Sequence, residues 1–126
     1  MISKIRSNRA AFTLVEIMIV VAIIGLLAAL AIPGFVKARK QSQGRRIIND
    51  VRQLDAAIDQ WALEKGKKDG DALVTSEAAS YLKVAWSDND VLNNAYTFST
   101  VGTNQVRISS SSKSALQGVG IDWGAF

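Results

Sequence analysis

A long apolar segment near the N-terminus constrains the fold more than any other feature of this 126-residue chain. The run Ile17–Ile32 is wholly apolar. Glu16 is the only charged residue between Arg9 and Lys37. About twenty apolar residues span the hydrocarbon core of a bilayer as a helix. A helix that is apolar on every side suits lipid better than a half-wetted protein core. We therefore predict a membrane-spanning helix.

After Lys37 the pattern becomes that of an amphipathic helix. Apolar residues recur at spacings of four and three, which places them on one helical stripe: Ile47, Val51, Leu54, Ile58 and Trp61. Lys65 and Gly66 form a stop signal, because a cation suits the helix C-terminus and glycine adopts positive φ. We predict one helix from about Thr13 to Lys65.

The sequence of residues 66–126 predicts a small globular domain, called the head below. Alternating residues at 96–101 and 105–109, joined by 102–104, predict a hairpin, and 119–123 alternate as a less certain third strand. A short helix capped by Thr75 and a turn-rich loop are expected before the hairpin. The fold class is therefore α+β, a long N-terminal helix packed on a head with an antiparallel hairpin or three-stranded sheet. Because about sixty residues without disulfides make a marginal core, we expect the head to pack on the Leu54–Trp61 stretch.

The composition excludes most enzyme chemistry. The chain has no cysteine and no histidine, so it lacks a thiolate nucleophile, the usual general base and the commonest zinc ligands. The formal charge is +4, but three cations, Lys4, Arg6 and Arg9, lie in the first eleven residues and the rest is nearly neutral. We therefore expect neither an enzyme nor a nucleic-acid-binding surface.

The segment Phe12-Thr-Leu-Val-Glu16, followed by the apolar run, resembles the N-terminus of type IV pilins and type II secretion pseudopilins. A basic leader, residues 1–11, precedes it. The resemblance implies that a prepilin peptidase cleaves between Ala11 and Phe12 and methylates the new amine of Phe12. The family usually has glycine before the cut, and Ala11 keeps a small side chain there.

Glu16 is a candidate functional residue on physical grounds. A carboxylate inside a membrane-spanning segment costs about 2.5–3.5 kcal/mol on insertion scales and usually has a partner. The resemblance names that partner as the Phe12 amine of a neighbouring subunit, which makes Glu16 an assembly switch. The alternative is a carboxylate that reaches the lipid head groups and has no other role.

Pro33 and Gly34 are the second candidate feature of the helix. Proline removes one helical hydrogen bond, and Pro33 falls where the family has its helix-breaking proline. We predict a helix break at Pro33 and Gly34 that loosens when subunits assemble. The alternative is a simple helix end at the membrane surface.

The expected organisation is a leader (1–11), a transmembrane assembly helix (12–36), its amphipathic continuation (37–65) and a globular head (66–126). The resemblance, the compact head and the absence of cysteine favour a major-pseudopilin-like subunit of a type II secretion pseudopilus that drives protein export. The alternative is a type IV pilus pilin for adhesion, motility or DNA uptake. Implied partners are copies of itself, the prepilin peptidase, an inner-membrane assembly platform, minor pseudopilins and membrane lipid.

The resemblance also sets the topology, a single pass of the bacterial inner membrane with a cytoplasmic N-terminus and a periplasmic head, before entry into a filament. A count of basic residues alone would place the head in the cytoplasm. Two further alternatives are a secretory signal peptide cut after Ala31 and a signal-anchored protein that forms no filament.

Two weaker hypotheses concern binding. A basic stretch could attract lipid head groups or DNA, but it lacks interleaved aromatic residues, and pairing with acidic residues of neighbouring rods is favoured. The basic stretch comprises Lys37, Arg39, Lys40, Arg45 and Arg46, and the acids are Asp50, Asp55 and Asp59. Asp88 and Asp90 could hold calcium through oxygen ligands, but a solvated turn is favoured, so no cofactor is expected.

Overall fold

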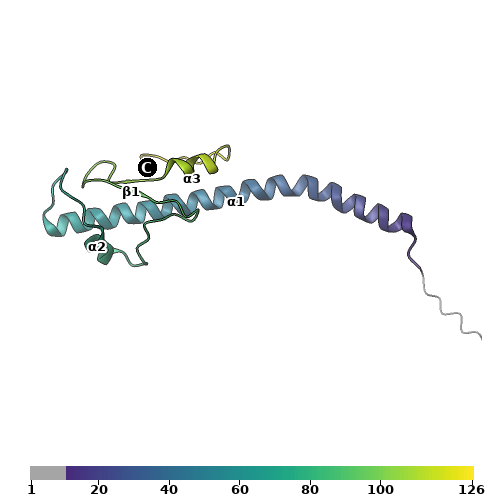
Figure 1. The fold of residues 1–126 in the computed structure, drawn as a ribbon, viewed down its shortest axis with the longest axis horizontal. Coiled ribbons are helices and arrows are strands. Elements are labelled where there is room, and N and C mark those ends of the chain that lie inside the picture. The colour runs from purple at the N-terminus through teal and green to yellow at the C-terminus, as the bar shows by residue number, and fades with distance from the viewer. Residues whose placement is uncertain (1–10) are drawn as a thin grey trace, which may run out of the picture. The chain divides into compact units, whose positions relative to one another are not determined.

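The computed structural model describes residues 11–126 (Figure 1). All but Ala11 of the predicted leader, including its three cations, lies outside the described residues and stays a prediction. The described chain divides into two compact units, one on each side of the boundary between residues 36 and 37. The boundary falls inside the first helix, α1 (Leu14–Lys65), and every other helix and strand belongs to the second unit.

The bounds of α1 confirm the predicted helix to within one residue at its start. At its end, Gly66 takes a φ of 64°. The Lys67 N–H donates to the Ala62 carbonyl at 2.8 Å, and the Gly66 N–H donates to the Leu63 carbonyl at 3.4 Å. This pair of bonds is a Schellman cap, which satisfies carbonyls that the helix end would otherwise leave unpaired.

The predicted break at Pro33 and Gly34 is absent from the described chain, because α1 includes both residues without interruption. A proline inside a helix removes its own hydrogen bond to the carbonyl four residues earlier, here that of Ala29, and its ring crowds that carbonyl. The neighbouring alanine and leucine residues favour the helical conformation, and the helix continues on both sides of Pro33. Loosening of this region on assembly stays a prediction.

In the first unit the apolar helix has no protein to pack against. Every side chain from 12 to 36 is exposed, apart from the half-buried Ala28. Within the described residues, α1 is long and apolar enough to cross a membrane. Such a continuous apolar surface requires lipid or other protein chains to cover it.

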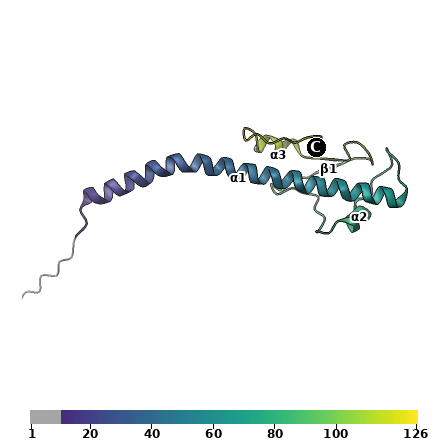
Figure 2. The same ribbon diagram turned by 180° about the vertical axis from the view of Figure 1, so that it is seen from behind.

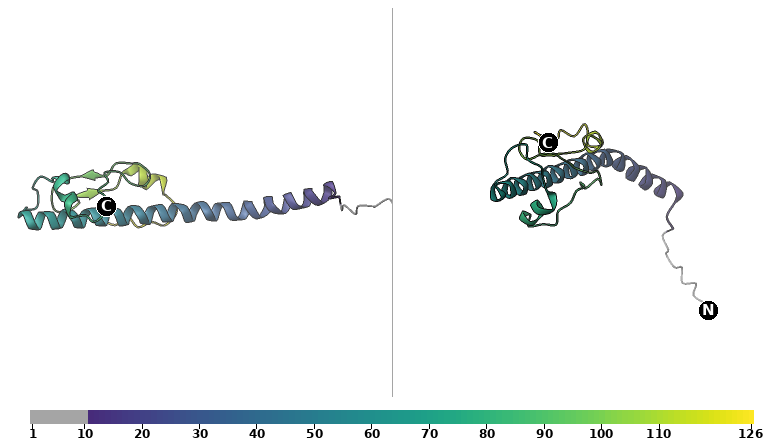
Figure 3. Two further views of the ribbon diagram at one scale, coloured as in Figure 1. Left: turned by 90° about the horizontal axis from the view of Figure 1, so that it is seen from below. Right: turned by 60° about the vertical axis from the view of Figure 1, so that its left-hand side comes forward.

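In the second unit the head packs on the predicted stripe of α1. Ile47, Val51, Ile58 and Trp61 are fully buried, and Leu54 is 3% exposed. Figure 1 shows β1 and α3 along one side of this part of α1 and α2 along the other, and Figures 2 and 3 show the same segments from other sides. The predicted packing of the head on this helix is therefore confirmed.

The head contains short elements. Helix α2 (Thr75–Ala78) continues as the 3₁₀ helix η1 (Ala79–Tyr81), strands β1 (Thr97–Phe98) and β2 (Val106–Arg107) form an antiparallel hairpin, and α3 (Ser110–Ala115) follows. In the hairpin, Phe98 is the partner of Val106 and Thr97 that of Arg107. The α+β class and the predicted hairpin are confirmed.

A buried amide fixes the hairpin to α1. Gln105 is 1% exposed, and its side-chain N–H groups donate to the Asp55 carboxylate at 2.8 Å and the Asp59 carboxylate at 2.7 Å. Its amide oxygen accepts from the Gly102 N–H at 3.1 Å. Because a buried polar group without partners is costly, these bonds hold the hairpin in one register on the helix.

The first turn of helix α3 is capped by the Ser109 hydroxyl. Two details of the predicted head were wrong. Residues 119–123 form no strand, since Gly118, Gly120 and Gly124 take positive φ and interrupt the extended backbone. Thr75 is the first residue of α2 and caps nothing, since the N-cap position belongs to the preceding residue.

The C-terminal segment instead packs as an irregular strap. Gly44 of α1 is buried, and a Cβ atom there would overlap the Ile121 side chain. The Gln41 side chain donates to the Val119 carbonyl at 3.1 Å, and the Ile108 N–H donates to the Phe126 carbonyl at 3.0 Å. The absence of a side chain at position 44 therefore allows the strap to lie close against the helix.

We predict that Ile58→Ala lowers the free energy of unfolding by about 2–5 kcal/mol, because it leaves a cavity in the core that the helix and head share. The matched control is Leu63→Ala on the same helix, where the side chain is 84% exposed and the cost should stay within about 0.5 kcal/mol. Urea unfolding of the detergent-solubilised chain, followed by tryptophan fluorescence, measures both. Equal losses in the two variants would contradict the assigned core.

Candidate functional site

The N-terminal end of α1 is closed by a reciprocal cap. The Glu16 N–H donates to the Thr13 hydroxyl at 3.2 Å, and the Thr13 N–H donates to the Glu16 carboxylate at 3.3 Å. This is a capping box, which satisfies two N–H groups that a helix start leaves free. The Thr-x-x-Glu spacing signals such a cap in the sequence, but sequence reasoning assigned Glu16 only a partner outside the chain.

The predicted cleavage junction lies immediately before this cap. Ala11 and Phe12 are exposed and precede the first helical residue, and the Phe12 side chain is 81% exposed. The Glu16 side chain is exposed on the first turn of α1. The structure therefore places an accessible peptide bond one helical turn before a carboxylate that has a neutral partner within its own chain.

The basic stretch after residue 36 forms one ion pair among the described residues, between Arg46 and Asp50 at 4.0 Å. Exposed ion pairs of this kind contribute about 0–1 kcal/mol to the free energy of unfolding. Asp55 and Asp59 instead accept hydrogen bonds from the buried amide of Gln105. Most of the cations stay exposed on α1, and the predicted pairing with neighbouring rods stays a prediction.

Asp88 and Asp90 lie in the same loop but have different roles. Asp90 is buried, and its carboxylate accepts from the Leu92 N–H at 2.9 Å, the Asn94 N–H at 3.0 Å and the Ser112 hydroxyl. Asp88 accepts from the Trp86 indole at 2.8 Å. Asp90 therefore anchors the loop to α3. Within residues 11–126 no group of three His, Cys, Asp or Glu side chains is placed to hold a metal ion, and calcium binding stays the less favoured hypothesis.

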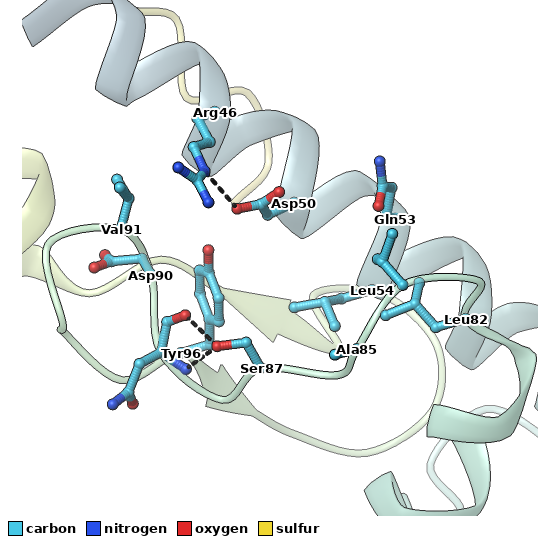
Figure 4. A pocket seen from close by; sticks show the side chains of 12 residues that line it. Arg46, Asp50, Gln53, Leu54, Leu82, Ala85, Ser87, Asp90, Val91 and Tyr96 are labelled. Atoms are coloured by element: carbon cyan, nitrogen blue, oxygen red, sulfur yellow. Dashed lines mark hydrogen bonds and ion pairs between the residues drawn. The ribbon is translucent and has the colours of Figure 1, made fainter. Parts of the chain in front are cut away.

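A cavity of about 500 Å³ lies between α1 and this loop (Figure 4). Its walls include the apolar side chains of Leu54, Leu82 and Val84. Figure 4 shows the Tyr96 hydroxyl pointing toward Arg46 and Asp50 on the helix. Tyr96 is 6% exposed, and among the described residues its hydroxyl has no hydrogen-bond partner. Sequence reasoning missed this site, because its residues come from separated parts of the chain.

Burial raises the pKa of the Tyr96 phenol, and the negative charges of Asp50 and Asp90 raise it further, whereas Arg46 lowers it. The phenol therefore keeps its proton well above the pH at which a free tyrosine loses it. A protonated hydroxyl that faces a cavity can donate a hydrogen bond to an acceptor atom of a group that enters the cavity.

A family model for the prokaryotic N-terminal methylation motif matches residues 6–32. The matched residues include the predicted cleavage junction, Glu16 and the whole apolar run Ile17–Ile32. The chain therefore carries the prepilin-type N-terminal motif.

Similarity to named proteins confirms the resemblance to type IV pilins and type II secretion pseudopilins. The type IV major fimbrial protein FimA of Dichelobacter nodosus is 35% identical over 98 residues, which cover 78% of this chain and 56% of that protein. The type II secretion system core protein G of Klebsiella michiganensis is 31% identical over 62 residues, covering 49% of this chain and 44% of that protein.

The type IV major pilin protein PilA of Myxococcus xanthus is 39% identical over 66 residues, covering 52% of this chain and 30% of that protein. This chain thus spans about half or less of the length of these three relatives. None of the three is named as an enzyme. No solved structure matches the chain.

We predict that the free energy of unfolding falls as the pH rises above about 10, the ordinary pKa of tyrosine. The unfolded chain then releases the Tyr96 proton while the folded chain retains it, so Tyr96 lowers the free energy of unfolding by about 1.4 kcal/mol for each pH unit. The variant Tyr96→Phe has no phenol to titrate, so this part of the pH dependence should be missing from it. Urea unfolding of both proteins near neutral pH and at alkaline pH measures the difference, and parallel losses in the two proteins would contradict it.

Proposed function

We propose that this chain is a membrane-inserted filament subunit that polymerises through its N-terminal helix after cleavage between Ala11 and Phe12. The observation that carries the proposal is the exposed apolar helix with one carboxylate at its start. A surface of this length needs lipid before assembly and other helices after it. In a filament, the apolar helices of many copies pack together and cover this surface after it has left the lipid.

Glu16 would make the assembly step selective. In the single chain its carboxylate accepts from the Thr13 N–H, which is a neutral partner. Cleavage creates a cationic amine at Phe12, and an incoming copy can bring that amine to Glu16. A buried charge strongly favours an opposite charge. Uncleaved chains lack the amine, so processing would control assembly.

We propose that the filament to which this chain belongs is a type II secretion pseudopilus. The similarity to a type II secretion system core protein G supports this choice. A surface type IV pilus is the second candidate, because the match to FimA covers more of the chain. Deletion of the gene distinguishes them. Loss of an exported protein from the medium supports the pseudopilus, and loss of surface fibres with normal export supports the pilus.

The same proposal includes the location and partners. The chain would cross the bacterial inner membrane once, with its N-terminus in the cytoplasm and its head in the periplasm. The prepilin motif supports processing by a prepilin peptidase. An inner-membrane assembly platform, minor pseudopilins and further copies of this chain would be its assembly partners.

We predict that the mature chain begins at a methylated Phe12, because the junction before it is exposed and lies within the matched motif. Intact mass spectrometry of the chain purified from membranes measures the start of the chain and the added methyl group. A chain that begins at Ile32 would show cleavage as a secretory signal peptide and would end the pilin hypothesis.

We predict that Glu16→Leu stops filament growth while monomer levels in the membrane stay normal. Removing the carboxylate lowers the insertion cost, but it leaves the incoming Phe12 amine without a counter-charge. Breaking a buried pair in this way costs about 3–5 kcal/mol, which is more than a hundredfold in the constant for each subunit addition. Shearing of filaments, beside a membrane-fraction blot, measures both quantities.

Two matched variants separate the charge of Glu16 from its cap. Glu16→Gln keeps an N3 side chain that can close the capping box but removes the charge, so it should fail as Glu16→Leu does. Thr13→Ala removes the reciprocal cap and keeps the charge, so it should retain filaments. Normal yield from Glu16→Gln with loss in Thr13→Ala would assign Glu16 to the cap alone.

A further inference from the structure

The basic stretch begins where the apolar part of α1 ends. Lys37 is the first charged residue after the apolar segment. The side chains of Lys37 and Arg39 are exposed, and that of Lys40 is half-buried. Arg45 and Arg46, farther along the helix, are also exposed. The helix therefore presents a group of cations directly after the segment that suits lipid.

The basic stretch has little counter-charge nearby in the chain. No acidic residue occurs between Glu16 and Asp50. Among residues 11–126, Arg46 and Asp50 form the one ion pair, so the other cations of the stretch have none there. Most of the charge that neutralises the stretch therefore comes from outside the described chain.

The acids of a neighbouring rod are poorly placed to supply this charge. Asp55 and Asp59 both accept hydrogen bonds from the buried amide of Gln105 in their own chain. Asp50 already pairs with Arg46. A neighbouring rod thus offers fewer free carboxylates than the sequence alone suggests.

The directions of the cationic side chains also favour lipid. Successive residues of an α-helix are turned by about 100°, so the five cations of the basic stretch cover the whole circumference with no gap wider than about 100°. One neighbouring rod lies on one side of a helix and faces only part of such an arrangement. Lipid surrounds a membrane-spanning helix on every side, and its head groups can meet all five cations.

The spacing along the helix places the first cations at the level of lipid phosphates. Val36 follows Glu16 by twenty residues, about 30 Å of helix, which equals the thickness of the hydrocarbon core. When that segment fills the core, Lys37 is the first residue in the head-group layer, which is about 5–8 Å deep. Lys40 lies about 4.5 Å beyond Lys37, inside this layer, whereas Arg45 lies about 12 Å beyond it.

We propose that the basic stretch binds the phosphate groups of anionic phospholipids while the chain is inserted in the membrane as a monomer. This inference rests on the proposed membrane insertion and names the class of lipid held there. Each Lys or Arg near an anionic lipid surface strengthens binding about fivefold. The bound lipid would hold the helix at one depth, since sinking would bring cations into hydrocarbon and rising would lose the attraction.

A probe within the basic stretch measures which lipid gathers around it. The chain has no cysteine, so Ser42→Cys, at an exposed position, carries a single fluorophore on the full chain. The labelled chain is reconstituted in phosphatidylcholine vesicles that contain a small fraction of nitroxide-labelled phosphatidylglycerol or, in parallel, nitroxide-labelled phosphatidylcholine. We expect the anionic lipid to quench the fluorophore at least tenfold more strongly. Both leaflets contain the labelled lipid, so the result does not depend on the orientation of the chain.

A triple variant removes the cations that lie in the head-group layer. We expect the preference for the anionic lipid to fall to about threefold or less, because only the two more distant cations of the stretch remain. The substitutions, made together in the labelled chain, are Lys37→Gln, Arg39→Gln and Lys40→Gln.

A matched control removes the same charge farther from the membrane. The nearest of its three exposed cations lies twelve residues beyond Lys40, about 18 Å along the helix, so the preference should stay within about twofold of that of the labelled chain. The substitutions are Arg52→Gln, Lys65→Gln and Lys68→Gln.

High salt tests the same attraction without a substitution in the basic stretch. In 1 M salt the Debye length is about 3 Å, so the preference of the labelled chain for the anionic lipid should fall at least threefold. This measurement does not depend on the folding of the triple variant. A preference that is unchanged in 1 M salt would overturn the proposal.

The remaining outcomes separate the lipid site from the filament function. Equal quenching by the two lipids at low salt would overturn the lipid site and leave the filament function standing. Equal quenching together with binding of a short DNA duplex, lost in the triple variant and kept in the control, would assign the stretch to nucleic acid instead. A strong lipid preference in a chain that forms no filaments, in a strain with an assembly system, would overturn the filament function alone.

Discussion

The burial of one stripe of α1 is the interaction on which the head depends. Ile47, Val51, Ile58 and Trp61 lose all contact with solvent, and the two-residue strands of the hairpin have no other layer to cover them. Short strands and helices of this kind are unstable alone, so the helix acts as the scaffold. The remaining elements are fixed to it by specific polar contacts, of which the buried amide of Gln105 makes the largest set.

The start of the same helix obeys a different constraint. Between residues 12 and 36 the side chains are mostly apolar, and all but that of Ala28 are exposed. Glu16 interrupts this surface at its beginning, where it closes the helix with Thr13. The cap gives the carboxylate a neutral partner in the single chain. A cationic amine from another copy would be a stronger one, because electrostatic attraction grows as water is excluded.

In the proposed filament, apolar helices alone would have little means of choosing one register, since an apolar surface gains similar burial at several displacements. A charge pair between Glu16 and the Phe12 amine of another copy would favour one displacement of a subunit along its neighbour, because a buried carboxylate without an opposite charge is costly. Specificity would then come from this polar contact, while the apolar helix supplies most of the attraction.

The bounds of α1, its buried stripe and its glycine stop follow from local rules of periodicity and capping, so they were readable from residues 13–66 alone. The hairpin was also predictable from alternation. The Thr-x-x-Glu spacing indicates the cap formed by Thr13 and Glu16, but sequence reasoning overlooked it. Helix α3 and the irregular C-terminal strap were not predicted, because Ser109 caps α3 and the glycines near the C-terminus take positive φ where alternation suggested a strand. The cavity beside Tyr96 was not predicted, because its residues come from separated parts of the chain. Local sequence thus specifies which segments form a helix, whereas the tertiary structure decides which polar groups are left without partners, since that depends on contacts between residues far apart in the chain.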